Sequence, residues 1–156
     1  MSALKKIIFF AHRFEDGALV LALISMLLMA LLQILLRNLF DSGFLWAESF
    51  LRILVLWIAM LGAMVATREG HHISIDLLSN VLKPGFFVPL RFASLAFASA
   101  ISFTTAYYCI EFIGYEYIDG TIAFAKVPVC VCMSILPIGF GVMGLRFLLT
   151  IFVKEN

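Results

Sequence analysis

Charged side chains are scarce in this sequence, and apolar side chains are in excess. Asp, Glu, Lys and Arg make up 13% of the residues and hydrophobic residues 63%, whereas soluble domains average about 25% and roughly 45–50%. So many apolar residues exceed what a soluble core can hold, which excludes an ordinary soluble domain. The sequence also lacks a basic tract interleaved with aromatic residues, which excludes a nucleic-acid-binding function.

Metal-ligating residues are few and poorly placed for a site. No histidine lies within an apolar run, so a bis-histidine haem between helices is excluded. Cys130 and Cys132 have the wrong spacing for a usual zinc or redox pair. His71 and His72 are adjacent and would point in different directions on a helix. We therefore expect no metal ion, no cofactor and no enzymatic activity.

Long uncharged stretches are what the sequence has instead. Gly17–Leu36 contains 20 such residues, Ile53–Thr67 contains 15, and Phe92–Ile110 and Val127–Leu145 contain 19 each. A helix needs about 20 apolar residues to cross a bilayer core. The sequence therefore predicts an all-α integral membrane protein that forms a single membrane domain over residues 1–156. Its four transmembrane helices are expected at approximately 17–36, 50–67, 87–110 and 127–150.

Short amphipathic helices are predicted beside the second span. In residues 71–82 the apolar side chains recur with helical spacing and polar side chains occupy the other positions, and Pro84-Gly85 ends the pattern. This indicates an amphipathic helix in the membrane interface. Before the span, Asp41 and Ser42 can cap a helix that continues through Trp46. Tryptophan is typical of the membrane–water boundary.

The basic residues predict the orientation of the chain. With four spans, both termini share a side of the membrane. That side holds eight basic residues: Lys5, Lys6, Arg13, Arg68, Lys83, Arg91, Arg146 and Lys154. The other side holds three: Arg37, Arg52 and Lys126. The positive-inside rule then places both termini in the cytoplasm. Loops at 37–49 and 111–126 are expected to face outside. The acidic residues of the loop at 111–126 either meet a partner there or are merely solvated: Glu111, Glu116 and Asp119.

Polar residues gather around the ends of the second span. Glu48 and Arg52 are four residues apart with the acid first, the favourable order on a helix. Two interpretations remain open: these charges anchor the span in the interface, or they form a buried pair with Arg37 or with another subunit. The candidate anchor or subunit-interface residues are Arg37, Trp46, Glu48, Arg52, Arg68, His72 and Asp76.

Glycines of the fourth span spell the G-x-G-x-x-G pattern of dinucleotide-binding proteins. They are Gly139, Gly141 and Gly144, but neither a strand before them nor a βαβ unit after them is predicted, as that motif requires. Small residues instead let two membrane helices approach closely. We therefore expect these glycines, and Gly62 in the second span, to serve helix packing.

The apolar centres of the four spans carry no carboxylate and no lysine. An ion-coupled carrier ordinarily needs such groups, or broken helices, to hold its ion and substrate. The chain is therefore predicted to be a helper subunit of a transporter. Two alternatives are a stand-alone small four-helix carrier, which would need a membrane-embedded glutamate in its first span, and a membrane anchor of a redox complex, which would need an intramembrane histidine.

The stretch from Arg37 to Asp76 resembles the small membrane subunit, or DctQ-type subunit, of tripartite ATP-independent periplasmic (TRAP) transporters. The matching positions are Arg37, Phe40, Trp46, Glu48, Arg52, Trp57, Leu61-Gly62, Arg68, His72-Ile73 and Asp76. The family often has a second acid where this chain has Ser49.

The resemblance implies a role in the uptake of organic acids such as a dicarboxylate, sialic acid or another sugar acid. A periplasmic substrate-binding protein would capture the acid, and a large membrane subunit would move it with a sodium or proton gradient. The small subunit would bind and scaffold the large one and help to dock the binding protein. It would be a multi-pass protein of a bacterial or archaeal cytoplasmic membrane, surrounded by lipid, with the coupling ion held in its partner.

Overall fold

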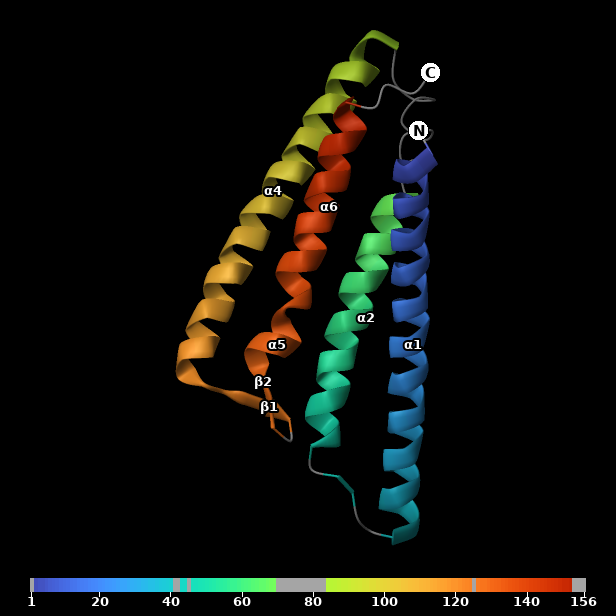
Figure 1. The fold of residues 1–156 in the computed structure, drawn as a ribbon, viewed down its shortest axis with the longest axis vertical. Helices are drawn as coiled ribbons and strands as arrows, with labels where there is room; N and C mark the ends of the chain where they lie inside the picture. The colour runs from blue at the N-terminus through green and yellow to red at the C-terminus, as the bar shows by residue number, and fades with distance from the viewer. Residues whose placement is uncertain (1, 41–42, 45, 70–83, 125, 153–156) are drawn as a thin grey trace. The chain divides into compact units, whose positions relative to one another are not determined.

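The computed structural model describes residues 2–40, 43–44, 46–69, 84–124 and 126–152 (Figure 1). The elements in chain order are α1 (Ser2–Phe40), α2 (Ala47–Glu69), α4 (Pro84–Asp119), β1 (Ile122–Phe124), β2 (Val127–Pro128), α5 (Val129–Met133) and α6 (Ile135–Phe152). The predicted amphipathic helix at 71–82 and the predicted helix cap at Asp41 and Ser42 lie outside the described residues.

Four helical segments in the described part of the chain are long and apolar enough to cross a membrane. They are Phe9–Phe40, Ala47–Arg68, Pro89–Asp119 and Val129–Ile151. Helices pair every interior backbone N–H with a carbonyl of the same segment, which a lipid environment requires. The predicted fold class, an all-α membrane protein with four transmembrane helices, is confirmed.

Helices α1 and α4 are longer than a bilayer core requires. They contain 39 and 36 residues, which correspond to about 58 Å and about 54 Å of helix. A hydrocarbon core is about 30 Å thick. Each helix therefore has at least one end outside the hydrocarbon, unless it is steeply tilted.

The chain divides into two compact units. Unit 1 comprises Met1–Gly62 and Phe112–Ile135. Its buried residues include Ala22 on α1, three residues of α2, and Cys132 on α5; the three are Ala47, Met60 and Leu61. Unit 1 also contains the hairpin of β1 and β2, whose contacts with α5 fix the start of the fourth membrane-crossing segment.

Unit 2 comprises Ala63–Glu111 and Leu136–Asn156. The buried side chains in its described part are small or flexible, namely Met64, Ser99, Ser102, Ala106 and Met143. Ser99 donates a hydrogen bond of 3.1 Å to the carbonyl oxygen of Gly144. An α4 side chain and the α6 backbone therefore lie in direct contact in this unit.

The predicted loop at 111–126 is wrong for its first nine residues, because α4 continues to Asp119. No proline occurs between Arg91 and Asp119, and the helix ends where Gly120 adopts a φ of 64°. The Gly120 amide donates 3.2 Å to the Glu116 carbonyl, the bond of a left-handed helix C-cap. Glu111, Glu116 and Asp119 are therefore helical residues. The predicted loop at 37–49 is likewise shortened, since Arg37–Phe40 belong to α1 and Ala47–Ser49 to α2.

A short antiparallel hairpin, which the sequence did not predict, follows this cap. Strand β1 pairs with β2 in the register Ile122 with Pro128 and Phe124 with Val127, with an irregularity between the two pairs. The amide of Val129 donates 3.0 Å to the carbonyl of Thr121, and Thr121 itself donates from its hydroxyl to the Glu116 carboxylate. These bonds join the end of α4 to the start of α5.

The fourth membrane-crossing segment is broken at Ser134, between α5 and α6. Pro137 has no N–H to donate to the carbonyl of Met133, and its ring clashes with that carbonyl in a continuous helix. Ser134 closes the turn instead, because its amide and hydroxyl both donate to the Val131 carbonyl, at 3.3 and 2.7 Å. The fourth span, predicted at approximately 127–150, therefore consists of two helices.

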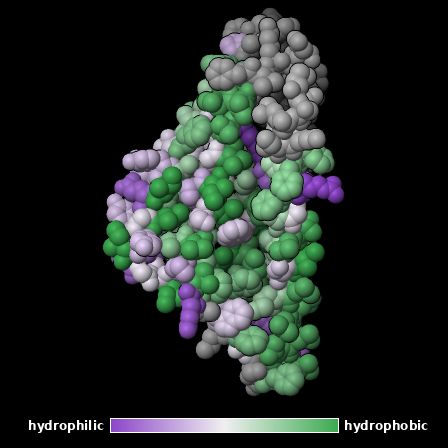
Figure 2. All heavy atoms as spheres, in the orientation of Figure 1, coloured by the Kyte–Doolittle hydropathy of each residue, from purple (hydrophilic) through white to green (hydrophobic). Residues whose placement is uncertain are grey.

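Most apolar side chains of the described residues are exposed in the isolated chain. In the most apolar stretch of α1 only 6% of the residues are buried, and residues such as Leu21, Leu28 and Leu35 are more than half exposed. Figure 2 shows hydrophobic atoms (green) over much of the visible face and hydrophilic atoms (purple) in a few places. This surface requires lipid or another protein to cover it.

The cap at Gly120 gives a prediction with a matched control. Gly120→Ala should destabilise the protein by about 1 kcal/mol, because a Cβ strains the left-handed conformation. Gly114→Ala in the same helix should be neutral or stabilising, since its Cβ meets no atom within 4 Å and alanine favours helix over glycine by about 1 kcal/mol. Chemical unfolding in detergent, followed by circular dichroism, measures both. Equal shifts for the two variants would contradict the assignment of the cap.

Candidate functional site

The start of α2 is held by backbone contacts that place Trp46 just before the helix. The amide of Ala47 donates 3.1 Å to the Phe44 carbonyl, and the amide of Phe50 donates 3.1 Å to the Trp46 carbonyl. Ala47 is completely buried. These contacts fix the position at which α2 starts. Glu48 lies in its first turn, where a negative charge interacts favourably with the helix dipole.

Glu48 and Arg52 form an ion pair across one turn of α2. Arg52 Nη2 lies 2.6 Å from Glu48 Oε1, and the side chains are 70% exposed for Glu48 and 76% for Arg52. In the described ranges Glu48 pairs with Arg52 and forms no ion pair with Arg37, an exposed residue in the last turn of α1. Such an exposed pair contributes about 0–1 kcal/mol to stability. A larger contribution would require another molecule to cover it.

Four aromatic rings surround the start of α2 and connect it to β1. Trp46 lies 5.6 Å from Phe44, 6.1 Å from Phe50 and 6.4 Å from Phe124 between ring centroids. Phe50 and Phe124 meet edge to face at 5.1 Å. Phe44 and Trp46 remain about two-fifths exposed. We name these four residues the aromatic cluster; its one tryptophan, Trp46, is of the type enriched at the membrane–water boundary.

Trp57 connects α2 to α5. Its indole Nε1 donates a hydrogen bond of 2.9 Å to the carbonyl oxygen of Cys132. Because α5 has only five residues, its last carbonyls lack the partners that a longer helix would supply. Trp57 satisfies one of them at the break before α6. Trp57 is among the positions that carry the family resemblance, but its hydrogen-bonding role was not foreseen.

A hollow of about 510 Å³ lies in unit 1 between the first turns of α2, the hairpin and α5. Its residues are Ser49, Arg52, Ile53, Leu56, Ile122, Ala123, Val129, Cys132 and Met133. Only Ser49 and Arg52 have polar side chains other than the cysteine. We name this the hairpin hollow.

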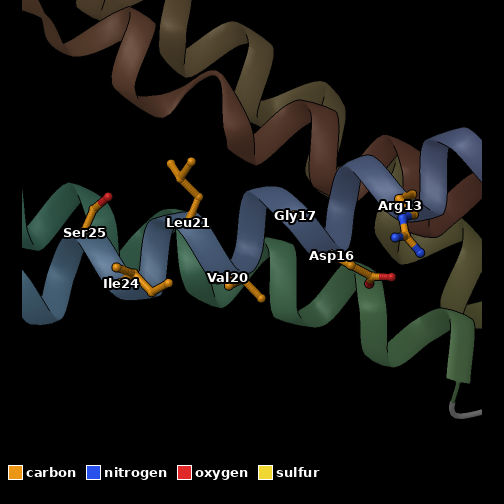
Figure 3. A pocket seen from close by; sticks show the side chains of 7 residues that line it. All are labelled: Arg13, Asp16, Gly17, Val20, Leu21, Ile24 and Ser25. Carbon is orange, nitrogen blue, oxygen red and sulfur yellow. The ribbon is translucent and has the colours of Figure 1, made fainter.

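A second hollow, of about 680 Å³, is lined in the described part of the chain by one face of α1. Figure 3 shows Arg13 and Asp16 at one end of the row and Ser25 at the other, with Val20, Leu21 and Ile24 between. Arg13 and Asp16 are both exposed. The groups that line it belong to one helix, so no set of side chains from different elements converges there.

The carbonyl oxygen of Met64 is the centre of a partly buried polar contact in unit 2. It accepts hydrogen bonds from Thr67 Oγ1, at 2.7 Å, and from Nη1 of Arg146 on α6. Arg68, in the last turn of α2, is half-buried and also has a partner. Arg146 therefore ties α6 to α2, a role that its place between two apolar runs did not reveal.

The glycines of the predicted packing faces differ in their surroundings. A Cβ on Gly144 would lie 3.3 Å from three ring carbons of Phe103, whereas a Cβ on Gly62 or Gly141 would meet no atom within 4 Å. Gly139 is buried. The structure thus brings two helices close at Gly144, and Gly62 and Gly141 leave room for a neighbour.

Three residues remain to be placed: Glu15, which the sequence analysis did not single out, and the predicted candidates His72 and Asp76. Glu15 on α1 is only 7% exposed and has a partner; it lies seven residues before buried Ala22, a spacing that places both on one helix face. His72 and Asp76 lie outside the described residues. Among the described residues, no group of three His, Cys, Asp or Glu could hold a metal ion.

The sequence profile described as tripartite ATP-independent periplasmic transporters, DctQ component, matches residues 26–154. This range contains α2, α4, the hairpin, α5 and α6, together with the Glu48–Arg52 pair and Trp57. The chain belongs to the DctQ family. It is therefore a small membrane subunit of the TRAP type, a transporter component and a multi-pass membrane protein.

Individual relatives agree with this membership. A putative TRAP transporter small permease protein of Haemophilus influenzae (strain Rd) is 42% identical over 65 residues, which are 42% of this chain and 39% of that protein. The ectoine TRAP transporter small permease protein TeaB of Halomonas elongata is 29% identical over 100 residues, or 64% of this chain and 52% of TeaB.

A third relative is much larger than this chain. The sialic acid TRAP transporter permease protein SiaT of Haemophilus influenzae (strain 86-028NP) is 36% identical over 66 residues, which are 42% of this chain and 10% of SiaT. The matched segments span about half or less of each of these three relatives.

Proposed function

We propose that this DctQ-family subunit binds and scaffolds the large membrane subunit of a TRAP-type secondary importer of organic acids. The observation that carries the proposal is the contrast between its centre and its surface. The apolar centres of the spans hold no carboxylate or lysine for a coupling ion. In contrast, apolar side chains are exposed along most of the length of α1. A protein with this pattern has surface for a partner and lacks the groups of a carrier.

The coupling sodium ion or proton is proposed to bind in the large subunit. Substrate choice is proposed to belong to the periplasmic binding protein, so the class remains organic acids, among them dicarboxylates, sialic acid and other sugar acids. The names of two relatives support a shared scaffold with varied substrates, because one relative is named for sialic acid and the other for ectoine.

The C-terminal end of α4 is the surface that we propose for docking the binding protein. Tyr115, Tyr117 and Ile118 are 60%, 75% and 80% exposed, and Asp119 follows them. Tyrosine is enriched in the centres of protein interfaces. With both termini in the cytoplasm, this end of α4 and the hairpin face the periplasm, where the binding protein is found.

The orientation rests on eight basic residues on the side of the termini against three on the other. A single cysteine at Ala3 should react with a membrane-impermeant maleimide only after the cells are opened, whereas a cysteine at Asp119 should react in intact cells. The native cysteines are replaced by serine in both variants. Labelling of position 3 from outside would reject the orientation.

Transport should require the large subunit. In liposomes that contain this chain alone, with the periplasmic binding protein and a sodium or proton gradient, no gradient-driven uptake of radiolabelled sialic acid, succinate or ectoine is expected. Addition of the large subunit should produce uptake of the acid that the binding protein carries. Uptake by the chain alone would refute the helper function.

The Glu48–Arg52 pair tests the contact with the large subunit. If a partner covers the pair, Arg52→Ala strands Glu48 and should weaken assembly by about 3–5 kcal/mol. The same substitution in the isolated chain should cost at most about 1 kcal/mol. Co-purification of the two subunits measures the first effect and unfolding in detergent the second.

Arg13→Ala is the matched control for Arg52→Ala, because Arg13 is an exposed arginine that does not belong to the Glu48–Arg52 pair. Reversal of both charges, Glu48→Arg with Arg52→Glu, should harm assembly less than either reversal alone. If Arg52→Ala and Glu48→Ala co-purify and transport like the parent, the pair only anchors the span in the interface.

A further inference from the structure

The hairpin hollow has a polar mouth and an apolar interior. Ser49 and Arg52 lie in the first two turns of α2, and Ile53 and Leu56 lie one turn further along the helix. From Ser49 to Leu56 the helix rises about 10 Å. The opposite wall consists of apolar residues of the hairpin and α5, except for the buried thiol of Cys132.

The aromatic cluster indicates the depth of this hollow in the membrane. Trp46 and Phe50 flank the first turn of α2, and Phe124 is adjacent to Ala123 of the hollow wall. Tryptophan is enriched at the level of the lipid headgroups, so Trp46 is the member of the cluster that indicates this depth. The polar mouth is then at headgroup level, and the residues one turn deeper are at the level of the acyl chains.

The charges at the mouth match a molecule that carries both signs. Arg52 lines the mouth, and Glu48, which precedes the lining residue Ser49 in the chain, is paired with Arg52 at 2.6 Å. Both side chains are largely exposed, so each can accept a further partner. An anion alone would be attracted by Arg52 and repelled by Glu48. A headgroup with a phosphate and an ammonium a few ångströms apart satisfies both side chains, with charge-assisted hydrogen bonds at each.

We propose that the hairpin hollow is a binding site for one phosphatidylethanolamine molecule of the surrounding bilayer. Its phosphate lies against Arg52, its ammonium lies against Glu48, and part of one acyl chain lies along Ile53, Leu56 and Met133. This site goes beyond the scaffolding function and does not depend on it, because its residues all belong to this chain.

Native mass spectrometry of the full chain, purified alone in mild detergent, tests the site. Added 1-palmitoyl-2-oleoyl-phosphatidylethanolamine should give one tightly retained lipid. Leu56→Trp fills the hollow and should lower retention at least about tenfold, because loss of about two buried methylene groups already has that effect. Val55→Trp is the matched control, since Val55 is adjacent, 55% exposed and absent from the lining; it should retain the lipid like the parent.

Met133→Trp fills the hollow from the α5 side and should have the same effect as Leu56→Trp. Circular dichroism of each variant verifies that the helices are intact. Equal retention by the parent and both filled variants would overturn the site. Transport assays are not involved, so failure of the lipid site is distinguishable from failure of the scaffolding function.

The headgroup assignment is tested by comparison with 1-palmitoyl-2-oleoyl-phosphatidylglycerol, which has no ammonium group. The parent should prefer phosphatidylethanolamine about fivefold, and Glu48→Gln should abolish or reverse this preference, because Arg52 is then an unpaired cation. Arg52→Gln should weaken retention of both lipids. Equal retention of the two lipids by the parent would overturn the headgroup assignment. Loss of the lipid when the large subunit binds would overturn the proposal in favour of a protein segment in the hollow.

Discussion

The need to satisfy every backbone polar group without water governs this chain. Within a bilayer core an unpaired amide or carbonyl costs several kcal/mol, so the long apolar segments are helical and each interruption has its own hydrogen bonds. At Gly120 the left-handed cap returns an amide to Glu116. At Ser134 the hydroxyl and the amide close the turn, and the indole of Trp57 reaches the carbonyl of Cys132. The hairpin connects these two interruptions.

The same constraint explains why the polar side chains are in contact with backbone. Arg146 donates to the Met64 carbonyl, and Ser99 donates to the Gly144 carbonyl. A side chain that meets a carbonyl in this way brings two helices together and satisfies polar groups that lipid cannot satisfy. Glu48 and Arg52 differ, because they pair with each other at the surface. In the membrane this exposed pair is accessible to lipid headgroups or to a second subunit.

The helices and the Glu48–Arg52 pair were predictable because they depend on local spacing. Uncharged runs of membrane length and an acid four residues before an arginine need no information about distant residues. The break at Ser134 was not predicted although Pro137 marks it. Hydropathy measures only how apolar a segment is and contains no information about the backbone N–H that proline lacks. The continuation of α4 to Asp119 was not predicted, because charged residues after an apolar run indicate the end of a membrane span. The helix itself continues until a residue such as Gly120 ends it. Trp57 and Arg146 have partners 75 and 82 residues away in sequence, and no local pattern reveals such contacts.

The length of α4 makes this helix sensitive to membrane thickness. About 54 Å of helix must be accommodated by a bilayer whose core is about 30 Å and differs by several ångströms between membranes. A thicker bilayer covers more of the tyrosine-rich end, and a thinner one leaves more of it in water unless the helix tilts. In the orientation that we propose, the height of Tyr115 and Tyr117 relative to the lipid is thus set jointly by the protein and by the membrane. Lipid composition thereby becomes a variable in any encounter made at that end of the helix.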